Sequence, residues 1–191
     1  MIEQLSIWDE QLFLWLNSFH TDWLDPIVFQ LTKTVTWLPL FLFLIYKIYR
    51  YDPKNSWWVF GGVALTILFA DQVTSSFMKP FFERLRPCHD ARWEGLIHNY
   101  ERCGGLYGFA SSHAANTFGM ATFLNLKMRK KVPYFGWLFL YATLVSYTRI
   151  YLGVHYPLDL LVGALIGMAS AYLVWFLIVY VKREVVKKIL R

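Results

Sequence analysis

The most apolar stretch of the chain, PLDLLVGALIGMASAYLVWFLIVYV, occupies residues 157–181 and carries a single charge, Asp159. A helix needs roughly 20 mainly apolar residues to cross the hydrocarbon of a bilayer, and this stretch exceeds that length. Within it, Gly163 and Gly167 form a small-xxx-small pair, which suits close contact between two helices. The stretch therefore predicts a membrane helix with a tightly packed neighbour.

Four windows upstream are also nearly free of charge, and each predicts a further membrane helix. They run approximately over residues 26–46, 57–78, 111–126 and 132–148. Lys33 interrupts the first window, and Asp71 lies near the far end of the second. With 57% hydrophobic and 17% charged residues, the chain is too apolar for an ordinary soluble domain. We expect a single all-α membrane domain over residues 1–191, a polytopic bundle of about five transmembrane helices.

The positive charge of the chain, formally +6, is distributed unevenly along it. Twelve of the 19 Lys and Arg residues follow the first, third and fifth windows: Lys47, Arg50, Lys54, Lys127, Arg129, Lys130, Lys131, Lys182, Arg183, Lys187, Lys188 and Arg191. Residues 1–25 contain five acids and no Lys or Arg. Because short cytoplasmic loops are enriched in Lys and Arg, we expect the C-terminus in the cytoplasm and residues 1–25 outside it. The charge thus reports topology, and we expect no nucleic-acid partner.

Residues 1–25 are predicted to form an interfacial helix rather than a signal peptide, because they lack a basic start and a cleavage site. Apolar side chains recur there at helical spacing: Leu5, Trp8, Leu12, Trp15, Leu16 and Phe19. Polar residues occupy much of the other side: Glu3, Glu10, Gln11 and Asn17. Such a helix lies in the membrane surface. Two interpretations remain open, a plain surface anchor and a lid beside a lipid entrance.

The extracytoplasmic connection over residues 79–110 is unusually rich in cations for that side of the membrane. They are Lys79, Arg84, Arg86, Arg92 and Arg102, set against the acids Glu83, Asp90, Glu94 and Glu101. The segment KPFFERLRP, residues 79–87, places the Lys79 ammonium and the Arg86 guanidinium seven residues apart at a membrane surface. These groups are candidates for binding an anion. The alternative is that they only snorkel from the ends of spans.

A second candidate segment is GFASSHAAN, residues 108–116, where a Gly- and Ser-rich turn leads into a span. Hydroxyls and free backbone amides at a helix N-terminus form a natural anion site. His113 would lie in the first turn, directed at the bound anion. The alternative is a serine cap followed by an interfacial histidine.

The third segment is TRIYLGVHYPLD, residues 148–159. If one helix includes both His155 and Asp159, the two share a face, and the carboxylate can accept a hydrogen bond from one imidazole nitrogen. The other nitrogen then keeps a free lone pair, as an activated nucleophilic histidine requires. A buried His–Asp pair can also be purely structural, but ionisable groups at membrane depth are costly and indicate function.

Together the three segments resemble the signature of the type 2 phosphatidic acid phosphatase and vanadium haloperoxidase superfamily. That signature reads K-x-x-x-x-x-x-R-P, then P-S-G-H, then S-R-x-x-x-x-x-H-x-x-x-D. The first motif is complete in residues 79–87, and the third keeps Arg149, His155 and Asp159 at full spacing. The resemblance covers roughly residues 79–159 at motif level and implies a membrane lipid phosphatase without a metal ion or other cofactor.

Three residues depart from the family pattern. Ala110 stands in place of the proline and Ser112 in place of the glycine of the second motif, and Thr148 replaces the leading serine of the third. The side chain at Ser112 lies where backbone approaches the phosphate, so this part of the pocket is expected to be reshaped with activity retained. Thr148 keeps the hydroxyl group.

The resemblance also implies a role for each matching residue. His155 looks like the nucleophile that forms a phosphohistidine, Asp159 like its orienting partner, and His113 like the general acid that protonates the leaving oxygen. The groups expected to bind the phosphoryl oxygens are Lys79, Arg86, Ser111, Ser112 and Arg149. Prearranged cations and donors stabilise the charge of a phosphoryl group in transfer.

The substrate is expected to be a lipid phosphate whose tails stay in the bilayer, because all three motifs lie at extracytoplasmic ends of spans. Undecaprenyl pyrophosphate, phosphatidic acid, phosphatidylglycerol phosphate and lipid A phosphate all fit, with a slight preference for undecaprenyl pyrophosphate or another envelope lipid of a bacterial inner membrane. The alternatives are a vanadate-dependent haloperoxidase, whose relatives are typically soluble, and a noncatalytic protein that binds lipid phosphates. The oligomeric state is left open.

Two cysteines, Cys88 and Cys103, lie 15 positions apart in the extracytoplasmic connection. In an oxidising compartment we expect them to form a disulfide, which would stabilise the fold by about 3 kcal/mol in the chain-entropy estimate. Two free thiols are the alternative. Asp71 is open to two interpretations, support of Lys79 or a structural hydrogen bond within the bundle.

Overall fold

The computed structural model of the protein describes residues 2–100 and 103–189. These parts are almost wholly helical, and their only β-like feature is an isolated antiparallel bridge between Leu85 and Tyr107. The charged groups that lie outside the described parts are Glu101, Arg102, Arg191 and the side chains of Glu184, Lys187 and Lys188. The all-α prediction is confirmed.

The described residues form helices in the following order. The α-helices are α1(Ile2–Asn17), α2(Asp25–Leu31), α3(Leu38–Tyr51), α4(Ser56–Asp71), α5(Lys79–Phe82), α6(Ser112–Met128), α7(Leu138–Tyr151) and α8(Pro157–Ile189). Short 3-10 turns are η1(Thr34–Trp37), η2(Pro53–Asn55), η4(Pro87–His89), η5(Ala91–Trp93) and η6(Pro133–Trp137), and a π-helical segment, η3(Gln72–Met78), joins α4 to α5.

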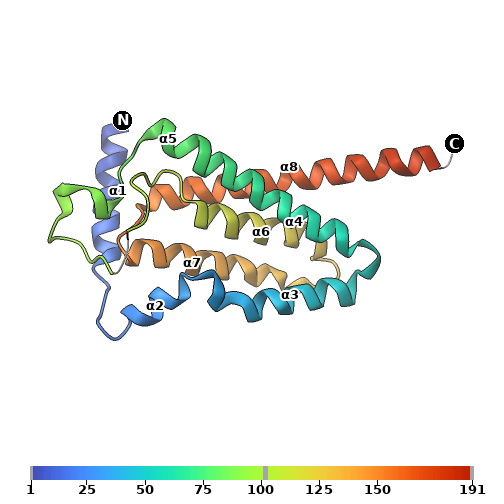
Figure 1. Cartoon of the computed structure of the whole chain (residues 1–191), viewed down its shortest axis with the longest axis horizontal. Coiled ribbons are helices and arrows are strands. Elements are labelled where there is room, and N and C mark those ends of the chain that lie inside the picture. Colours follow the sequence, from blue (N-terminus) through green and yellow to red (C-terminus); the bar gives the residue numbers. More distant parts are fainter. Residues whose placement is uncertain (1, 101–102, 190–191) are drawn as a thin grey trace.

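The five apolar windows of the sequence correspond to helices α2–α3, α4, α6, α7 and α8, of which α3, α4, α6, α7 and α8 run alongside one another (Figure 1). Two helical segments of the described chain, Pro53–Phe82 and Pro157–Arg183, are long and apolar enough by themselves to cross a membrane. A third is the pair Asp25–Leu31 and Thr34–Tyr51, if this pair, bent by 72°, forms one span. Helices α6 and α7 lie in the same bundle but are shorter, and much of α6 is buried by its neighbours.

Helix α6 is the central element, and α8 packs on it more extensively than any other pair of helices packs together. Two glycines of α8 allow this approach: a Cβ atom at Gly163 would collide with the backbone oxygen of Ser111, and one at Gly167 with that of Ala115. The close contact expected from the small-xxx-small pair is therefore present, and it holds α8 against the first turn of α6.

Helix α1 lies across one end of the bundle rather than along it (Figure 1). Its inner face carries Asp9, Phe13 and Asn17, four residues apart and all buried. The Nδ2 atom of Asn17 donates to the carbonyl groups of Ile150 and Tyr151 at 3.0 Å. The apolar residues Leu5, Trp8, Leu12, Trp15 and Phe19 remain exposed. The outward apolar face fits a helix that lies in a membrane surface, and Asn17, expected on the polar side, instead contacts the bundle.

The connection predicted over residues 79–110 is shorter than expected, because its first four residues continue the preceding helix as α5. Pro80 lies just after the π-helical segment η3, whose last turn bonds the N–H of Lys79 to the carbonyl of Thr74. The helix ends at Glu83, which adopts a left-handed backbone conformation with φ of 47°. Lys79 is therefore presented by a helix and not by a loop.

Candidate active site

The predicted His–Asp pair is present at the start of α8. The Nδ1 atom of His155 lies 3.2 Å from Oδ2 of Asp159, and both side chains are almost wholly buried. The helix begins only at Pro157, so the two residues do not share a helical face as the spacing predicted. Instead Oδ2 of Asp159 accepts a hydrogen bond of 3.0 Å from the main-chain N–H of Tyr156. A carboxylate at the third helical position that reaches back to the cap in this way also faces His155.

The turn between α7 and His155 depends on one glycine. Gly153 has a φ of 70°, and a Cβ atom there would lie 2.6 Å from the main-chain oxygen of His98. Any other residue would therefore be strained and would push the turn away from its neighbour. The carbonyl of Gly153 also accepts a hydrogen bond from the N–H of Cys88. The turn is thus fixed against the connection that carries Arg86.

The protonation state of His155 follows from its partners. A guanidinium group can only donate hydrogen bonds, and Nη1 of Arg86 lies 2.9 Å from Nε2 of His155. Nε2 must therefore accept, and the ring proton lies on Nδ1, which faces Asp159. Burial lowers the pKa of His155 well below its usual value, and the nearby Arg86 and Arg149 lower it further. The imidazole is neutral with its lone pair on Nε2.

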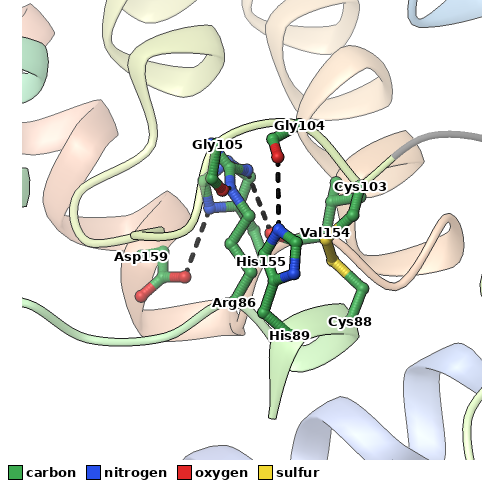
Figure 2. Close-up of a disulfide and its surroundings, with 9 residues drawn as sticks. All are labelled: Arg86, Cys88, His89, Cys103, Gly104, Gly105, Val154, His155 and Asp159. Atoms are coloured by element: carbon green, nitrogen blue, oxygen red, sulfur yellow. Dashed lines mark hydrogen bonds and ion pairs between the residues drawn. A yellow bond between two sulfur atoms is a disulfide. The ribbon is translucent and has the colours of Figure 1, made fainter.

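Arg86 is held in place by main-chain carbonyls on both sides. Its Nε donates to Gly105 at 2.6 Å and its Nη1 donates to Val154 at 3.2 Å. Figure 2 shows this side chain beside His155, with the Cys88–Cys103 disulfide close by. The disulfide joins the segment that carries Arg86 to the segment that carries Gly105. The covalent link and the hydrogen bonds together fix the guanidinium group.

The first turn of α6 contributes the second motif. Ser111 occupies the N-cap position, but its side chain does not cap the helix, and its buried Oγ has no partner among the described residues. The N–H of Ser111 donates to the carbonyl of Asp159 at 2.9 Å. His113 follows in the same turn and is exposed to a cavity that it lines. The serine hydroxyl is therefore free for a ligand, contrary to the capping alternative.

Ser112, which replaces the glycine of the family motif, contacts another predicted site residue. Its Oγ lies 2.7 Å from the Nζ atom of Lys79 and 2.9 Å from the hydroxyl groups of Thr74 and Ser75. Thr74 and Ser75 belong to the π-helical segment η3, and π-helical turns are frequent at functional sites. The extra side chain at this position thus anchors the ammonium group of Lys79.

Arg149 reaches the site from the last turn of α7. Its Nη1 donates to the hydroxyl of Thr32 at 2.6 Å, whereas its buried Nε has no partner within the described part of the chain. Lys79, Arg86 and Arg149 all contribute positive charge around His155. The structure therefore brings the three motifs to one end of the bundle.

Two residues of the site were not predicted from the sequence. The guanidinium of Arg84 contacts Oδ1 of Asp159 at 3.0 Å and Oδ2 of Asp9 at 2.7 Å. Arg84 was one of several cations in its connection, and Asp9 was one of five N-terminal acids. The only available signal was the helical alignment of Asp9 with Phe13 and Asn17, which does not by itself indicate a partner.

A cavity of about 650 Å³ extends from the site into the bundle. Its inner part is apolar and lies between helices α3, α4, α6 and α7: Phe41, Leu44, Phe60, Met120 and Tyr141. Its other end carries polar side chains beside His113: Asp71, Ser112, Asn116 and Thr117. The arrangement suits an amphipathic ligand with its polar group at His113.

Comparison with known proteins agrees with the sequence motifs. The family model of the PAP2 superfamily matches residues 60–183. A lipid A 4′-phosphatase of Bacteroides thetaiotaomicron is 39% identical over 188 residues, with 93% of this chain and 80% of that protein covered. An undecaprenyl-diphosphatase of Sulfolobus acidocaldarius is 39% identical over 175 residues, with 90% of this chain and 79% of that protein covered.

A solved structure has the same fold. It is the first transmembrane PAP2 type phosphatidylglycerolphosphate phosphatase from Bacillus subtilis, which superimposes with a TM-score of 0.67 at 20% sequence identity. The alignment covers 91% of this chain and 86% of that one. At this level of identity the similarity concerns the fold alone.

Proposed function

We propose, from the premise that this chain belongs to the PAP2 superfamily, that His155 is the nucleophile of a membrane lipid phosphatase. The protein is an integral membrane phosphatase of the PAP2 type, as its relatives and its apolar helices indicate. The assignment of individual residues rests on the contacts around His155 and on the match of the three motifs to the family pattern.

The reaction proceeds in two steps. In the first, the Nε2 lone pair of His155 attacks phosphorus, the bond between phosphorus and the leaving oxygen breaks, and His113 gives its proton to that oxygen. In the second, His113 takes a proton from water, whose oxygen attacks phosphorus, and the N–P bond breaks. Inorganic phosphate leaves and Nε2 regains its lone pair. Asp159 stabilises the positive charge that develops on the imidazole of His155 during the first step.

The phosphoryl oxygens would be bound by Lys79, Arg86, Arg149 and the hydroxyl of Ser111. These cations and donors take the place of a metal ion, because they neutralise the charge that spreads over the oxygens in transfer. Ser112 contributes indirectly, by fixing Lys79 through their contact of 2.7 Å.

One observation carries this proposal: Ser111 Oγ and Arg149 Nε are buried groups without a partner in the described residues, and both belong to the predicted phosphate site. A buried donor that lacks an acceptor costs about 1–3 kcal/mol. The main-chain N–H of Ser111 donates a hydrogen bond to the carbonyl of Asp159, and the positive charge of Arg149 lowers the pKa of His155. Both groups therefore belong to the surroundings of the proposed nucleophile. Phosphoryl oxygens would supply the missing acceptors.

The lipid would lie with its phosphate at this end of the bundle and a hydrocarbon chain in the apolar cavity. We place this end on the extracytoplasmic side of a bacterial inner membrane. The support is the charge pattern, since the Lys- and Arg-rich segments precede α4 and α7 and form the last turns of α8, at the opposite end from α1 (Figure 1). The C-terminus would then lie in the cytoplasm.

The substrate that we propose first is a monophosphate on a sugar hydroxyl, of the lipid A 4′-phosphate class. The relative named for this activity matches 93% of the chain. The polar end of the cavity supports it, because Asp71 and Asn116 can bind hydroxyl groups beside the leaving oxygen, and Asn116 Oδ1 is buried without a partner in the described chain. A carboxylate there would also repel a second phosphate group.

Undecaprenyl pyrophosphate is the second candidate, because the match to an undecaprenyl-diphosphatase covers 90% of the chain. In this case the leaving group is a lipid monophosphate, which carries its own negative charge. The leaving group next to His113 is therefore a sugar hydroxyl for the first candidate and a negatively charged phosphate for the second.

The proposal is tested by phosphate release from the purified protein in detergent, with lipid A phosphate, undecaprenyl pyrophosphate, phosphatidic acid and phosphatidylglycerol phosphate as substrates. We expect His155→Ala and His113→Ala to abolish release and His89→Ala, an exposed histidine of the nearby connection, to retain it. A quench in alkaline SDS after reaction with a ³²P-labelled substrate should trap a phosphoprotein in wild type and none in His155→Ala. Its label should be stable in base and lost in acid, as expected of a phosphohistidine. Equal release by wild type and His155→Ala would contradict the mechanism.

A further inference from the structure

We propose that Arg84 and Asp9 are positioning residues that keep the carboxylate of Asp159 oriented toward His155. Through Asp9, the surface helix α1 then supports the active site. This inference rests on the proposed function, because it assigns a role relative to the nucleophile. It is carried by the contacts of Arg84 with two buried carboxylates.

Arg84 divides its guanidinium group between the two acids. Its Nη1 lies 3.0 Å from Oδ1 of Asp159, and its Nη2 lies 2.7 Å from Oδ2 of Asp9. The side chain of Asp159 is 0% exposed and that of Asp9 is 1% exposed. Charge-assisted hydrogen bonds of this length are the stronger kind and restrict the orientation of both partners.

The contact with Arg84 fixes the rotation of the Asp159 carboxylate. Its Oδ2 contacts His155 and the N–H of Tyr156, and its Oδ1 contacts Arg84. Without a donor at Oδ1, the carboxylate group could turn about its bond to Cβ. The hydrogen bond that keeps the proton on Nδ1 of His155 would then weaken.

The contacts of Arg84 direct its guanidinium group at the two carboxylates, and we therefore assign it a positioning role rather than a phosphate-binding one. Its guanidinium lies 4.1 Å from the ring centroid of Tyr156, and its main-chain carbonyl accepts a hydrogen bond from Gly108. Both terminal nitrogens already face carboxylates. In this respect Arg84 differs from Arg86, which contacts the reacting nitrogen directly.

Asp9 connects this pair to the surface helix and to α8. Its second oxygen, Oδ1, accepts a hydrogen bond of 2.8 Å from the N–H of Leu158, in the first turn of α8. An acid at a helix N-terminus is favourable because the free N–H groups there are positively polarised. Asp9 therefore holds both Arg84 and the turn of α8 that carries Asp159.

The test is a double-mutant cycle on the full-length protein with Asp9→Asn, Arg84→Gln and the double variant. Because both residues act through Asp159, we expect kcat to fall about 10- to 100-fold, the loss typical of groups that orient a catalytic or metal-binding histidine. KM should change less than about twofold, since neither side chain binds phosphate. The double variant should be no slower than Arg84→Gln alone.

Glu10→Gln is the matched control, because Glu10 neighbours Asp9 on α1 but pairs with the exposed Arg92. It should retain the wild-type kcat. Folding of each variant is checked by thermal melting in detergent and by protection by orthovanadate, a phosphate analogue. Asp9→Glu, which keeps the charge, should restore a large part of the kcat lost in Asp9→Asn.

The pH profile provides a readout that a purely structural role would not change. The positive charge of Arg84 contributes to the lowered pKa of His155. Its removal in Arg84→Gln should therefore shift the acid limb of kcat/KM to higher pH. Asp9→Asn leaves that charge in place and should produce no upward shift.

Three results would overturn the inference: a rise in KM with unchanged kcat, additive losses in the double variant, or wild-type kcat in both single variants that fold. Failure of the proposed function is distinguishable, because it would appear as phosphate release by His155→Ala. If His155→Ala is inactive and Arg84→Gln is fully active, the proposed mechanism stands and only the positioning role of Arg84 is refuted.

Discussion

The Nη1 atom of Arg86 lies 2.9 Å from Nε2 of His155, so the group expected to bind the phosphoryl oxygens also touches the expected nucleophile. The contact fixes the Nδ1–H tautomer and keeps the lone pair of Nε2 directed toward a cation. A phosphate group that approaches this nitrogen therefore meets the guanidinium at the same time.

Replacement of Arg86 by Lys should lower kcat/KM by about 10- to 100-fold, the range of one charged hydrogen bond of ~1.5–3 kcal/mol. An ammonium group cannot reproduce the planar fork that contacts Gly105, Val154 and His155 together. Steady-state kinetics of phosphate release measures the effect. Arg92→Lys, at an exposed arginine of the same connection, serves as the control, and an equal loss in both variants would show that the site contacts of Arg86 are not its cause.

The stability of the folded protein should depend on pH because His155 is buried in its neutral state. Burial, followed by the charges of Arg86 and Arg149, lowers its pKa well below 6.5 in the folded protein, whereas the unfolded chain takes up the proton near 6.5. The stabilising contribution is therefore fully present above pH 6.5 and decreases as the pH falls toward the folded pKa, by up to ~1.4 kcal/mol per pH unit. Wild type should lose apparent Tm between pH 6.5 and 5 faster than His155→Ala. Parallel losses would contradict a buried neutral imidazole.

The disulfide should matter for both stability and activity. Cys88 and Cys103 enclose a loop of 15 residues, and its opening is expected to cost about 3 kcal/mol. Because the next residues include Gly105, which accepts a hydrogen bond from Arg86, reduction should also lower kcat/KM. Activity and thermal melting with and without dithiothreitol measure both effects. Cys88→Ser/Cys103→Ser should match reduced wild type and be insensitive to the reductant; wild-type values for the variant would refute the link.

The contact between α6 and α8 should tolerate no side chain at its two glycines. Gly163→Ala and Gly167→Ala should each destabilise the protein by about 1–3 kcal/mol, because the added methyl group meets backbone atoms. Gly163 faces Ser111, so Gly163→Ala should also reduce activity at a temperature where it remains folded, and Gly167→Ala should do so less. Gly61→Ala, where nothing lies within 4 Å, is the control for both assays. Equal stability in all three variants would exclude the close approach.

Asp71 should influence the choice between the two proposed substrates. Asp71→Asn removes a negative charge beside the leaving group and should raise kcat/KM for undecaprenyl pyrophosphate several-fold relative to lipid A phosphate. Competition between the two lipids in mixed micelles measures this ratio. Asp22→Asn, at an exposed acid near α2, should leave it unchanged. A ratio that is unaffected by Asp71→Asn would remove Asp71 from substrate selection.

The fold class and most of the site could be predicted because their signals are local. The five apolar windows correspond to the helices of the bundle, and the predicted contact between His155 and Asp159 is present. The reason for that contact was different from the predicted one, since α8 begins after His155 and the carboxylate reaches back to the helix cap. Sequence spacing alone does not show where a helix begins.

The contacts that were missed join residues far apart in the chain. Asp9 and Arg84 are separated by 75 positions, and neither belongs to a periodic pattern that points to the other. The contact between Ser112 and Lys79 was missed for a similar reason. It depends on a π-helical turn that the sequence does not reveal and that directs Thr74 and Ser75 toward the hydroxyl of Ser112. Such pairings depend on how the helices meet.

The burial of Asp9 against Arg84 also constrains how the protein can evolve. Loss of Arg84 alone leaves the buried carboxylate of Asp9 without its cation, a change that typically costs about 3–5 kcal/mol. Replacement of the arginine is thus expected to be selected against for stability as well as for activity. The two positions are expected to covary among homologues, and lineages without the acid on the surface helix should also have lost the arginine.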